Sequence, residues 1–242
     1  MSQTPVRTSD GSFTLYSPVY QEHYHGVRDG ALAESLYKHV IPGVTYSGAL
    51  GRPAIRILDI CFGLGFNTLA TLYYLKQQDY RGSIEIVSPE MDTGLVRSLA
   101  HLQYPAGLFG HLEVIASVSR TFLYQKERLT VRVVPGDATH FVQEASPPFD
   151  IIYQDPFSPK KNPELWTPSF FTHLRQLIAP HGVLTTYSQA RSVREALTGA
   201  GFEVYDLTPM SENPIRSGTL GAPFCFDALT RLSHKYPQGS DK

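Results

Sequence analysis

The hydrophobic pattern of the chain changes repeatedly between short apolar runs and longer segments with apolar residues at helical spacing. Short runs bounded by turn residues are typical of buried strands, and the longer segments are typical of amphipathic helices. Strands are predicted at 55–60, 84–90, 131–135, 150–154, 183–187 and 202–207. Helices are predicted at 66–76, 92–101, 117–126, 138–145, 168–179 and 191–200. This alternation predicts an α/β domain whose mostly parallel sheet has helices on both faces.

A last apolar run, 223–229, follows the loop 211–221 with no room for another crossover helix. A strand reached by so short a connection pairs antiparallel with its neighbour. We therefore expect the last strand to form a hairpin with 202–207. The predicted sheet has seven strands and is mostly parallel, with an antiparallel last strand.

The first 50 residues are predicted to form a small extension of strand, loop and helix. Residues 12–16 alternate like a strand, and 29–40 has apolar residues at helical spacing. Pro42 and Gly43 are expected to end that helix. The expected division is an extension at 1–50 that packs on the main domain, the main domain at 51–235, and a flexible tail at 236–242.

Composition narrows the class of protein. The chain has 242 residues, of which 42% are hydrophobic and 18% charged, enough for one substantial core. It has no apolar run long enough for a membrane span and no apolar core of a secretory signal, so a cytoplasmic protein is expected. The net charge of −1 gives no global basic field, so any nucleic-acid partner has to use a local patch.

The first candidate site is the turn after the strand 55–60. Gly63 and Gly65 allow a tight turn and close approach of the backbone to a ligand, and Asn67 lies at the helix start. Asp59 ends the strand with a carboxylate able to meet an amino group. Cys61 occupies the place of the first glycine of a dinucleotide fingerprint, which weakens a NAD interpretation. A turn that serves only packing is the alternative.

Two further acids follow successive strands. Glu90, with Asp92 as the alternative, is placed to bind both hydroxyls of a ribose. Asp137 and Ala138 follow the next strand and can offer a carboxylate and a backbone N–H to an adenine ring. Asp137 can equally be only the N-cap of the helix 138–145. Together these acids predict a nucleoside-containing cofactor at the carboxyl edge of the sheet.

The second candidate site is the stiff, aromatic loop that begins at Asp155, directly after an apolar strand. Together with the glycine turn, this loop suggests a methyltransferase. Transfer of a methyl group from a sulfonium is an in-line displacement, in which the protein aligns a nucleophile and removes a proton. Asp155 suits the second task, and the ring of Phe157 can stack on a base. The alternative is a simple turn between strand and helix, helped by Pro159 and Pro163.

These motifs resemble the methyltransferase of the MnmC family. The likeness covers roughly residues 12–221 and is carried by GALAES at 30–35, FGLGFN at 62–67, DPFSPKKNPELW at 155–166, LTTYS at 184–188, Val193-Arg194 and AGF at 200–202. It implies a class I (Rossmann-like) fold, S-adenosylmethionine as cofactor and no metal. It also implies methylation of the amine of 5-aminomethyl-(2-thio)uridine at the wobble position (U34) of tRNA.

The resemblance also implies partners and residue roles. The chain is similar to a stand-alone methyltransferase form without the flavin-dependent oxidase domain, so a separate enzyme would supply the aminomethyl-uridine. Independently of the resemblance, Tyr24 is expected at the cofactor mouth, with an ordinary surface loop as the equal alternative. The residues expected around the uridine and the tRNA phosphates are Phe157, Trp166, Tyr187, Lys160, Lys161 and Arg191. Core packing for Trp166, and an ordinary solvated surface for the basic residues, remain open alternatives.

Two competing functions remain. A small-molecule amine methyltransferase, or an aminopropyltransferase of the polyamine synthase type, shares this sheet and an acidic loop after the fourth strand. Lys160 and Lys161 would repel such a polycationic substrate. A non-catalytic RNA-binding protein of the same fold would be expected to have a degraded glycine turn or no acid at position 155.

Overall fold

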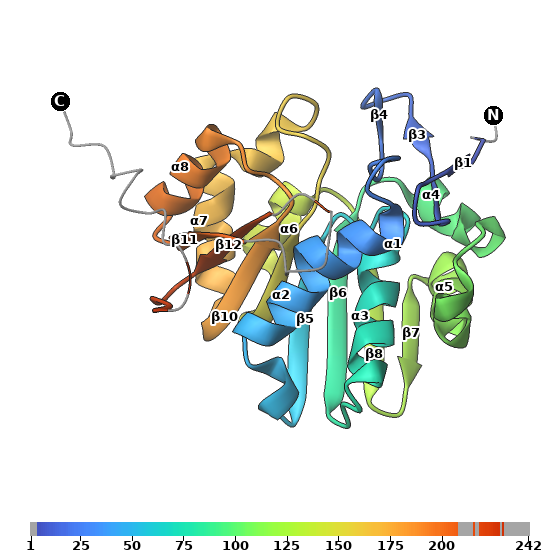
Figure 1. Cartoon of the computed structure of the whole chain (residues 1–242), viewed down its shortest axis with the longest axis horizontal. Helices are drawn as coiled ribbons and strands as arrows, with labels where there is room; N and C mark the ends of the chain where they lie inside the picture. Colours follow the sequence, from blue (N-terminus) through green and yellow to red (C-terminus); the bar gives the residue numbers. More distant parts are fainter. Residues whose placement is uncertain (1–3, 208–214, 216–217, 228, 230–242) are drawn as a thin grey trace.

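The computed structural model describes residues 4–207, 215, 218–227 and 229. Its centre is an eight-stranded sheet with the order β11-β12-β10-β9-β5-β6-β8-β7 (Figure 1). The strands are β5 Ala54–Ile60, β6 Ser83–Glu90, β7 Leu123–Lys126, β8 Leu129–Pro135, β9 Phe149–Gln154, β10 Ile178–Thr186, β11 Glu203–Asp206 and β12 Thr219–Ala222. The helices that follow the strands are α3 Phe66–Gln77, α4 Thr93–Ser98, α5 Leu112–Thr121, α6 Ala138–Glu144, α7 Pro168–Leu177 and α8 Arg191–Gly199.

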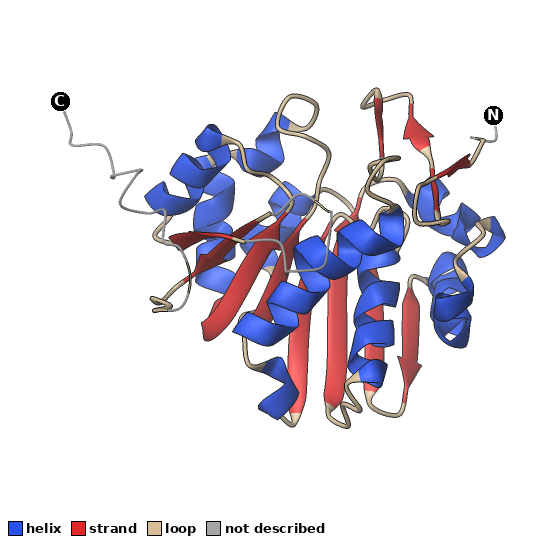
Figure 2. Ribbon diagram, in the orientation of Figure 1, coloured by secondary structure: helices blue, strands red, loops and turns tan. Residues whose placement is uncertain are grey.

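Helices cover both faces of the sheet, as the alternating pattern predicted (Figure 2). Successive side chains of a strand point to opposite faces, so each central strand contributes to two apolar layers. In β5, Ile57 joins the layer under α3 and α5, whereas Leu58 joins the layer under α6, α7 and α8. The parallel strands β5, β6, β8, β9 and β10 therefore end at one common edge.

The eighth strand corrects the predicted count of seven. Residues 123–126 were predicted as the end of a helix, but they form β7, which pairs antiparallel with β8. Helix α5 begins at Leu112 and ends at Thr121, where Phe122 adopts a positive φ of 60°. Glu127, at φ 49°, then lies in the turn between β7 and β8. The helical spacing of 117–121 was correct, but no local signal marked the left-handed residue that ends the helix.

The last strand has the predicted direction but a different position. It is β12, Thr219–Ala222, rather than 223–229, and it lies antiparallel between β10 and β11. Gly221 packs so closely on Phe202 that a Cβ would lie 3.2 Å from the ring. Small residues suit a strand inserted between two others, and a search for apolar runs misses them.

The N-terminal helix also differs from the prediction. It runs without a break through α1 Ala31–Glu34, a π-helical segment Ser35–Val40 and α2 Ile41–Tyr46. Pro42 lies directly after the π-helical segment, at the second residue of α2, and the helix continues through it. A Cβ on Gly43 would lie 2.9 Å from Cγ2 of Ile151, so this glycine permits close packing on β9 and does not end the helix.

Two short hairpins precede this helix. They pair β1 Val6–Arg7 with β2 Phe13–Thr14, and β3 Tyr16–Ser17 with β4 Glu22–His23. The hairpin β3–β4 lies beyond the carboxyl edge of the sheet (Figure 1). The predicted tail at 236–242 lies outside the described residues, and the division at residues 50 and 235 stays a prediction. Across the described part of the chain, no helix has the length and apolar character of a membrane span.

Candidate active site

A cavity of about 350 Å³ opens at the carboxyl edge of the sheet. Its walls are the hairpin β3–β4, the glycine turn after β5, the end of β6, the start of α6 and the loop after β9. Of the predicted site residues, those that line it are Tyr24, Gly63, Asn67, Glu90, Asp137, Ala138, Asp155 and Phe157. The fold therefore brings the acids of three strand ends, Glu90, Asp137 and Asp155, around one volume, as the carboxyl ends of parallel strands allow.

The glycine turn has the backbone geometry that its sequence predicted. Gly63 and Gly65 have positive φ values of 52° and 75°. A Cβ on Gly65 would lie 2.9 Å from Cδ1 of Ile115, so helix α3 starts against α5 only because this position has no side chain. Cys61, which also lines the cavity, is held at φ 70°, a region that a glycine adopts without strain.

Glu90 is fixed by the backbone on both of its oxygens. The N–H of Gly63 donates to Oε2 over 2.9 Å, and the N–H of Asp92 donates to Oε1 over 2.8 Å. Burial raises the pKa of Glu90. The carboxylate retains lone pairs for further donors, so it is able to accept from the two hydroxyls of a ribose.

Asp137 is the N-cap of α6 and also lines the cavity. Its Oδ1 accepts from the backbone N–H of Thr139 over 2.7 Å and from the Thr139 hydroxyl over 2.8 Å, which makes it the N-cap of α6. The same residue, with Ala138, lines the cavity. The cap holds the carboxylate at the cavity wall.

Asp59 lies behind the cavity wall rather than in it. It is fully buried and accepts from Nδ2 of Asn67 over 3.1 Å. Burial raises its pKa well above the ordinary value. The structure thus places Asp59 under Asn67, where it supports the glycine turn from below.

Asp155 is held from two sides at the end of β9. Nδ2 of Asn67 donates to its Oδ2 over 2.9 Å, and Nε2 of His39 lies 3.3 Å from its Oδ1. Burial opposes ionisation of Asp155, but the neighbouring His39 outweighs it and lowers the pKa of the carboxyl below the ordinary value. The lowered pKa keeps the carboxyl ionised, so it can hold a cationic group in place, and it also makes the carboxylate a weaker base.

The residues that line the cavity give it a negative charge. Five carboxylates line it, from Glu90, Asp92, Asp137, Asp155 and Glu164, and no Lys or Arg does so among the described residues. At close range in a half-buried site such a field attracts a positive guest. The charge, the glycine turn and the placed acids fit S-adenosylmethionine, whose sulfonium supplies the methyl group when bound.

Comparison with known proteins identifies the family. Residues 107–214 match the sequence model of a family described as an S-adenosyl-L-methionine-dependent methyltransferase. The crystal structure of MnmC2 from Aquifex aeolicus is 35% identical, covers 92% of this chain and 70% of its own, and superimposes with a TM-score of 0.82. This chain belongs to the MnmC2 methyltransferase family. The class I fold, the enzyme class and the cofactor expected from the sequence are thereby confirmed.

Several relatives are longer than this chain and align with it over only part of their length. The tRNA 5-methylaminomethyl-2-thiouridine biosynthesis bifunctional protein MnmC of Ralstonia nicotianae is 31% identical over 83% of this chain and 32% of its own length. The protein of the same name from Azoarcus sp. is 33% identical over 84% and 34%. An uncharacterized protein of Methanocaldococcus jannaschii is 29% identical over 82% and 54%. The chain spans about a third to a half of these relatives.

The predicted substrate residues of this MnmC2-type domain fall into two groups. Phe157 lines the cavity and stacks on Tyr20, with ring centroids 4.3 Å apart. Trp166 and Tyr187 instead hold the loop from behind. Nε1 of Trp166 donates to the Phe157 carbonyl over 2.9 Å, and the Tyr187 hydroxyl donates to the Pro156 carbonyl over 3.0 Å. Trp166 is 5% exposed, so the core alternative describes it better.

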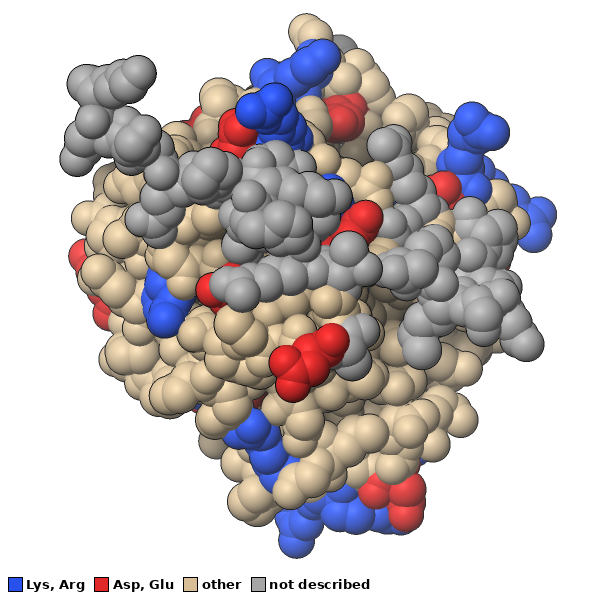
Figure 3. All heavy atoms as spheres, turned by 60° about the vertical axis from the view of Figure 1, so that its left-hand side comes forward, with Lys and Arg blue, Asp and Glu red and all other residues tan. Residues whose placement is uncertain are grey.

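The three predicted basic residues lie outside the cavity and are exposed. Nζ of Lys161 donates to Oε1 of Gln21 over 3.1 Å, and Arg191 pairs with Glu195 one helical turn away over 2.8 Å. Lys160 lies on the same loop as Lys161. On the face that Figure 3 presents, the Lys and Arg residues of the described part of the chain lie in small separate groups, several of them beside acidic residues.

Sequence reasoning missed His39, Tyr20 and Met91. His39 is buried in the N-terminal helix, and Tyr20 and Met91 line the cavity. Only Met91 had a signal, because it follows the acid at the end of β6. The other two come from the N-terminal extension, whose contact with the loop after β9 exists only in the folded chain.

Proposed function

We propose that this domain transfers the methyl group of S-adenosylmethionine to the amine of 5-aminomethyl-(2-thio)uridine at the wobble position (U34) of tRNA. The observation that carries the proposal is the Asp155 carboxylate, held by His39 and Asn67 beside the cavity at the carboxyl edge of the sheet. The printed names of the bifunctional MnmC relatives support this substrate. The product is 5-methylaminomethyl-(2-thio)uridine, and a separate enzyme would supply the amine.

The acceptor amine has to arrive without its extra proton, because only its lone pair can attack the methyl carbon. Asp155 would accept that proton and keep the amine close, with the lone pair directed at the methyl group. Asn67 and His39 hold the two oxygens, so the carboxylate does not need to reorient during the reaction. Phe157, stacked on Tyr20, would offer a ring face to the uridine.

The tRNA would approach from the open side of the cavity, where the loop 157–162 and the hairpin β3–β4 meet. The N–H of Ser158 donates to Oε2 of Glu22 over 3.0 Å, which joins the two segments. Lys160, Lys161 and Arg191 are the candidate phosphate contacts of this surface. Loss of one such contact is expected to weaken tRNA binding and to reduce its salt dependence.

The experiment is methyl transfer from labelled S-adenosylmethionine to tRNA from cells that lack this activity, followed by mass spectrometry of the nucleosides. The proposal predicts a new 5-methylaminomethyl-uridine species, absent with the Asp155→Asn variant. If the protein binds S-adenosylmethionine but leaves this tRNA unmodified, the proposed tRNA substrate is refuted.

The acidic cavity lining also favours a second candidate, a small-molecule amine methyltransferase or aminopropyltransferase. Five carboxylates without a lining Lys or Arg would suit a free polycation. The same assay with free diamines and polyamines separates the two. Transfer to these amines, with none to tRNA, would favour the second candidate.

A further inference from the structure

The π-helical segment Ser35–Val40 aims a buried histidine at the proposed proton acceptor. At its end the N–H of Ile41 bonds to the carbonyl of Leu36, five residues back, instead of four. The wider turn changes the direction of the side chains that follow, and such segments are frequent at functional sites. His39 lies in this segment and is 1% exposed.

Both ring nitrogens of His39 have partners on the sheet. Nε2 lies 3.3 Å from Oδ1 of Asp155, and Nδ1 lies 3.2 Å from the hydroxyl of Thr185, near the end of β10. The ring also meets Tyr153 edge-on at 5.9 Å. A threonine hydroxyl donates to a neutral ring and accepts from a protonated one, so the geometry serves both charge states of His39.

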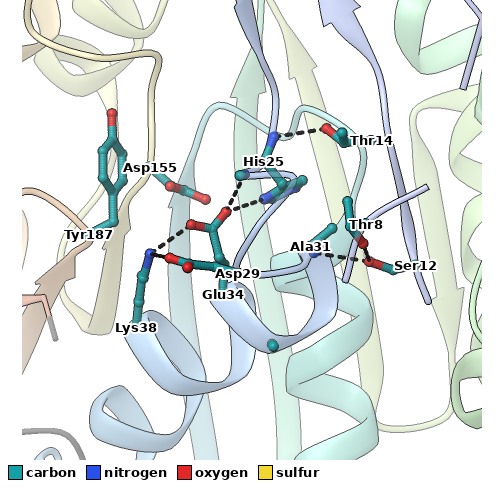
Figure 4. A network of polar contacts seen from close by, with 12 residues as sticks. Thr8, Ser12, Thr14, His25, Asp29, Ala31, Glu34, Lys38, Asp155 and Tyr187 are labelled. Atoms are coloured by element: carbon teal, nitrogen blue, oxygen red, sulfur yellow. Dashed lines mark hydrogen bonds and ion pairs between the residues drawn. The ribbon is translucent and has the colours of Figure 1, made fainter. Parts of the chain in front are cut away.

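The neighbouring charges are already paired with one another. On the same helix, Lys38 lies 2.7 Å from Oε1 of Glu34 and 2.8 Å from Oδ2 of Asp29. Glu34 also accepts from the backbone of Gly26, and His25 lies 3.8 Å from its Oε2 (Figure 4). Burial opposes ionisation of Glu34, but His25 and Lys38 lower its pKa to about 2.

The remaining polar groups around Asp155 act from other elements. Asn67 donates to Asp155 from α3 and is backed by Asp59 of β5. Tyr187 binds the backbone of the same loop, and His25 approaches from the hairpin side. Of the described residues, His39 is thus the one titratable side chain in direct contact with the Asp155 carboxylate.

We propose that His39 is a positioning residue for Asp155, holding its carboxylate ionised and oriented as the proton acceptor of the methyl transfer, with Thr185 fixing the ring. This rests on the proposed function for its consequence in catalysis, but the contact itself can be tested without any acceptor. The acceptor ammonium gives one proton to Asp155. The N–C bond then forms as the S–C bond breaks, and the electron pair stays on sulfur.

The variants are His39→Leu, which removes both contacts, His39→Gln, which keeps an N–H donor for Asp155, and Thr185→Val. The matched control is His181→Gln, because His181 also contacts an aspartate, Asp150, over 2.7 Å, but at the opposite edge of the sheet. The first readout is the titration of Asp155 by carbon NMR of labelled carboxyl groups, assigned with Asp155→Asn. It requires only the folded protein.

His39→Leu is expected to raise the pKa of Asp155, His39→Gln to raise it less, and the control His181→Gln to leave it unchanged. An unchanged Asp155 titration in both His39 variants would overturn the proposal. If His39→Leu does not fold, His39→Gln and Thr185→Val still decide it, because Thr185→Val frees the His39 ring and is also expected to raise the pKa of Asp155.

The second readout is turnover of whichever amine the enzyme methylates. His39→Leu is expected to lower kcat about tenfold or more, with the acidic limb of the pH profile moved to higher pH and partial rescue by glutamine. Affinity for S-adenosylmethionine, measured by calorimetry, should stay within about twofold because His39 does not line the cavity. If the NMR shift occurs and no tRNA is methylated, the proposed substrate fails while the role of His39 stands. An unchanged kcat and pH profile would refute the catalytic part of the inference.

Discussion

Strand β9 has an aspartate near each end, and the two carboxylates differ in how many hydrogen-bond donors surround them. Asp150, near the start, accepts from His181 over 2.7 Å, from Arg52 over 3.3 Å and from the backbone N–H of Arg56 over 2.8 Å. Asp155, just past the end, has one histidine and one amide, and it borders a cavity. The negative charge of Asp150 is offset by three hydrogen-bond donors. The Asp155 carboxylate has fewer donors and can still interact with a molecule bound in the cavity.

The difference follows from the direction of the sheet. At the amino edge, the Arg52 side chain before β5, the backbone N–H of Arg56 in β5 and the His181 side chain of β10 bind Asp150 as a structural link. At the carboxyl edge, the strands lead into a glycine turn and long loops, which leave a volume above Asp155. The histidine–aspartate contact at the amino edge links two strands, and the one at the carboxyl edge is the contact that we propose positions Asp155 for chemistry.

The largest expected effect comes from Asp155→Asn. Loss of the proton acceptor should lower the rate of methyl transfer by roughly 10² to 10⁴-fold. Calorimetry should still detect binding of S-adenosylmethionine, because the glycine turn and Glu90 remain. A variant that keeps most of the rate would remove Asp155 from the proposed role.

The matching change at the other end, Asp150→Asn, should act on stability. It leaves Arg52 and His181 with a weaker acceptor, which is expected to lower the free energy of unfolding by about 1–3 kcal/mol. Urea unfolding measures this loss, and the rate per folded molecule should be unchanged. A fall in rate without a fall in stability would contradict the division between the two edges.

Acid unfolding offers a further comparison, because Glu34 is a compensated carboxylate on the active-site side. Its pKa of about 2 lies below the ordinary value of 4.5, so the stability it contributes is complete above about pH 4.5 and is lost as the pH falls toward 2. Between these values, the free energy of unfolding should fall less steeply in Glu34→Gln than in the unchanged protein. Equal slopes would show that the carboxylate contributes nothing there.

The smallest expected effect belongs to Cys61→Gly. Cys61 is held at φ 70°, and release of that strain should exceed the entropy cost of a glycine, giving a net gain of about 1 kcal/mol or less. Thermal unfolding measures it. As a control at the amino edge, Gly48→Ala reverses the change at a similar φ of 66° with open space around it, and should destabilise.

Local features of the sequence determined most of the sheet, the glycine turn and the acids that follow the strands. These depend on periodicity and on residues adjacent in the chain, so the placement of Asp59, Glu90, Asp137 and Asp155 at the carboxyl ends of four strands could be predicted. Where a small residue replaced the expected signal, the prediction failed. β12 was displaced because Gly221 and Ala222 do not form an apolar run, and the N-terminal helix was cut short because Gly43 was interpreted as a stop.

Only the tertiary structure decided which of these acids face the cavity and what holds them. Asp59 lies behind Asn67 instead of in the cavity. Trp166, which was expected to contact the uridine, packs under the loop after β9. His39 contacts Asp155. The last of these contacts depends on how the N-terminal helix packs across β9 and β10. That packing joins residues far apart in the chain, so no spacing within one segment encodes it.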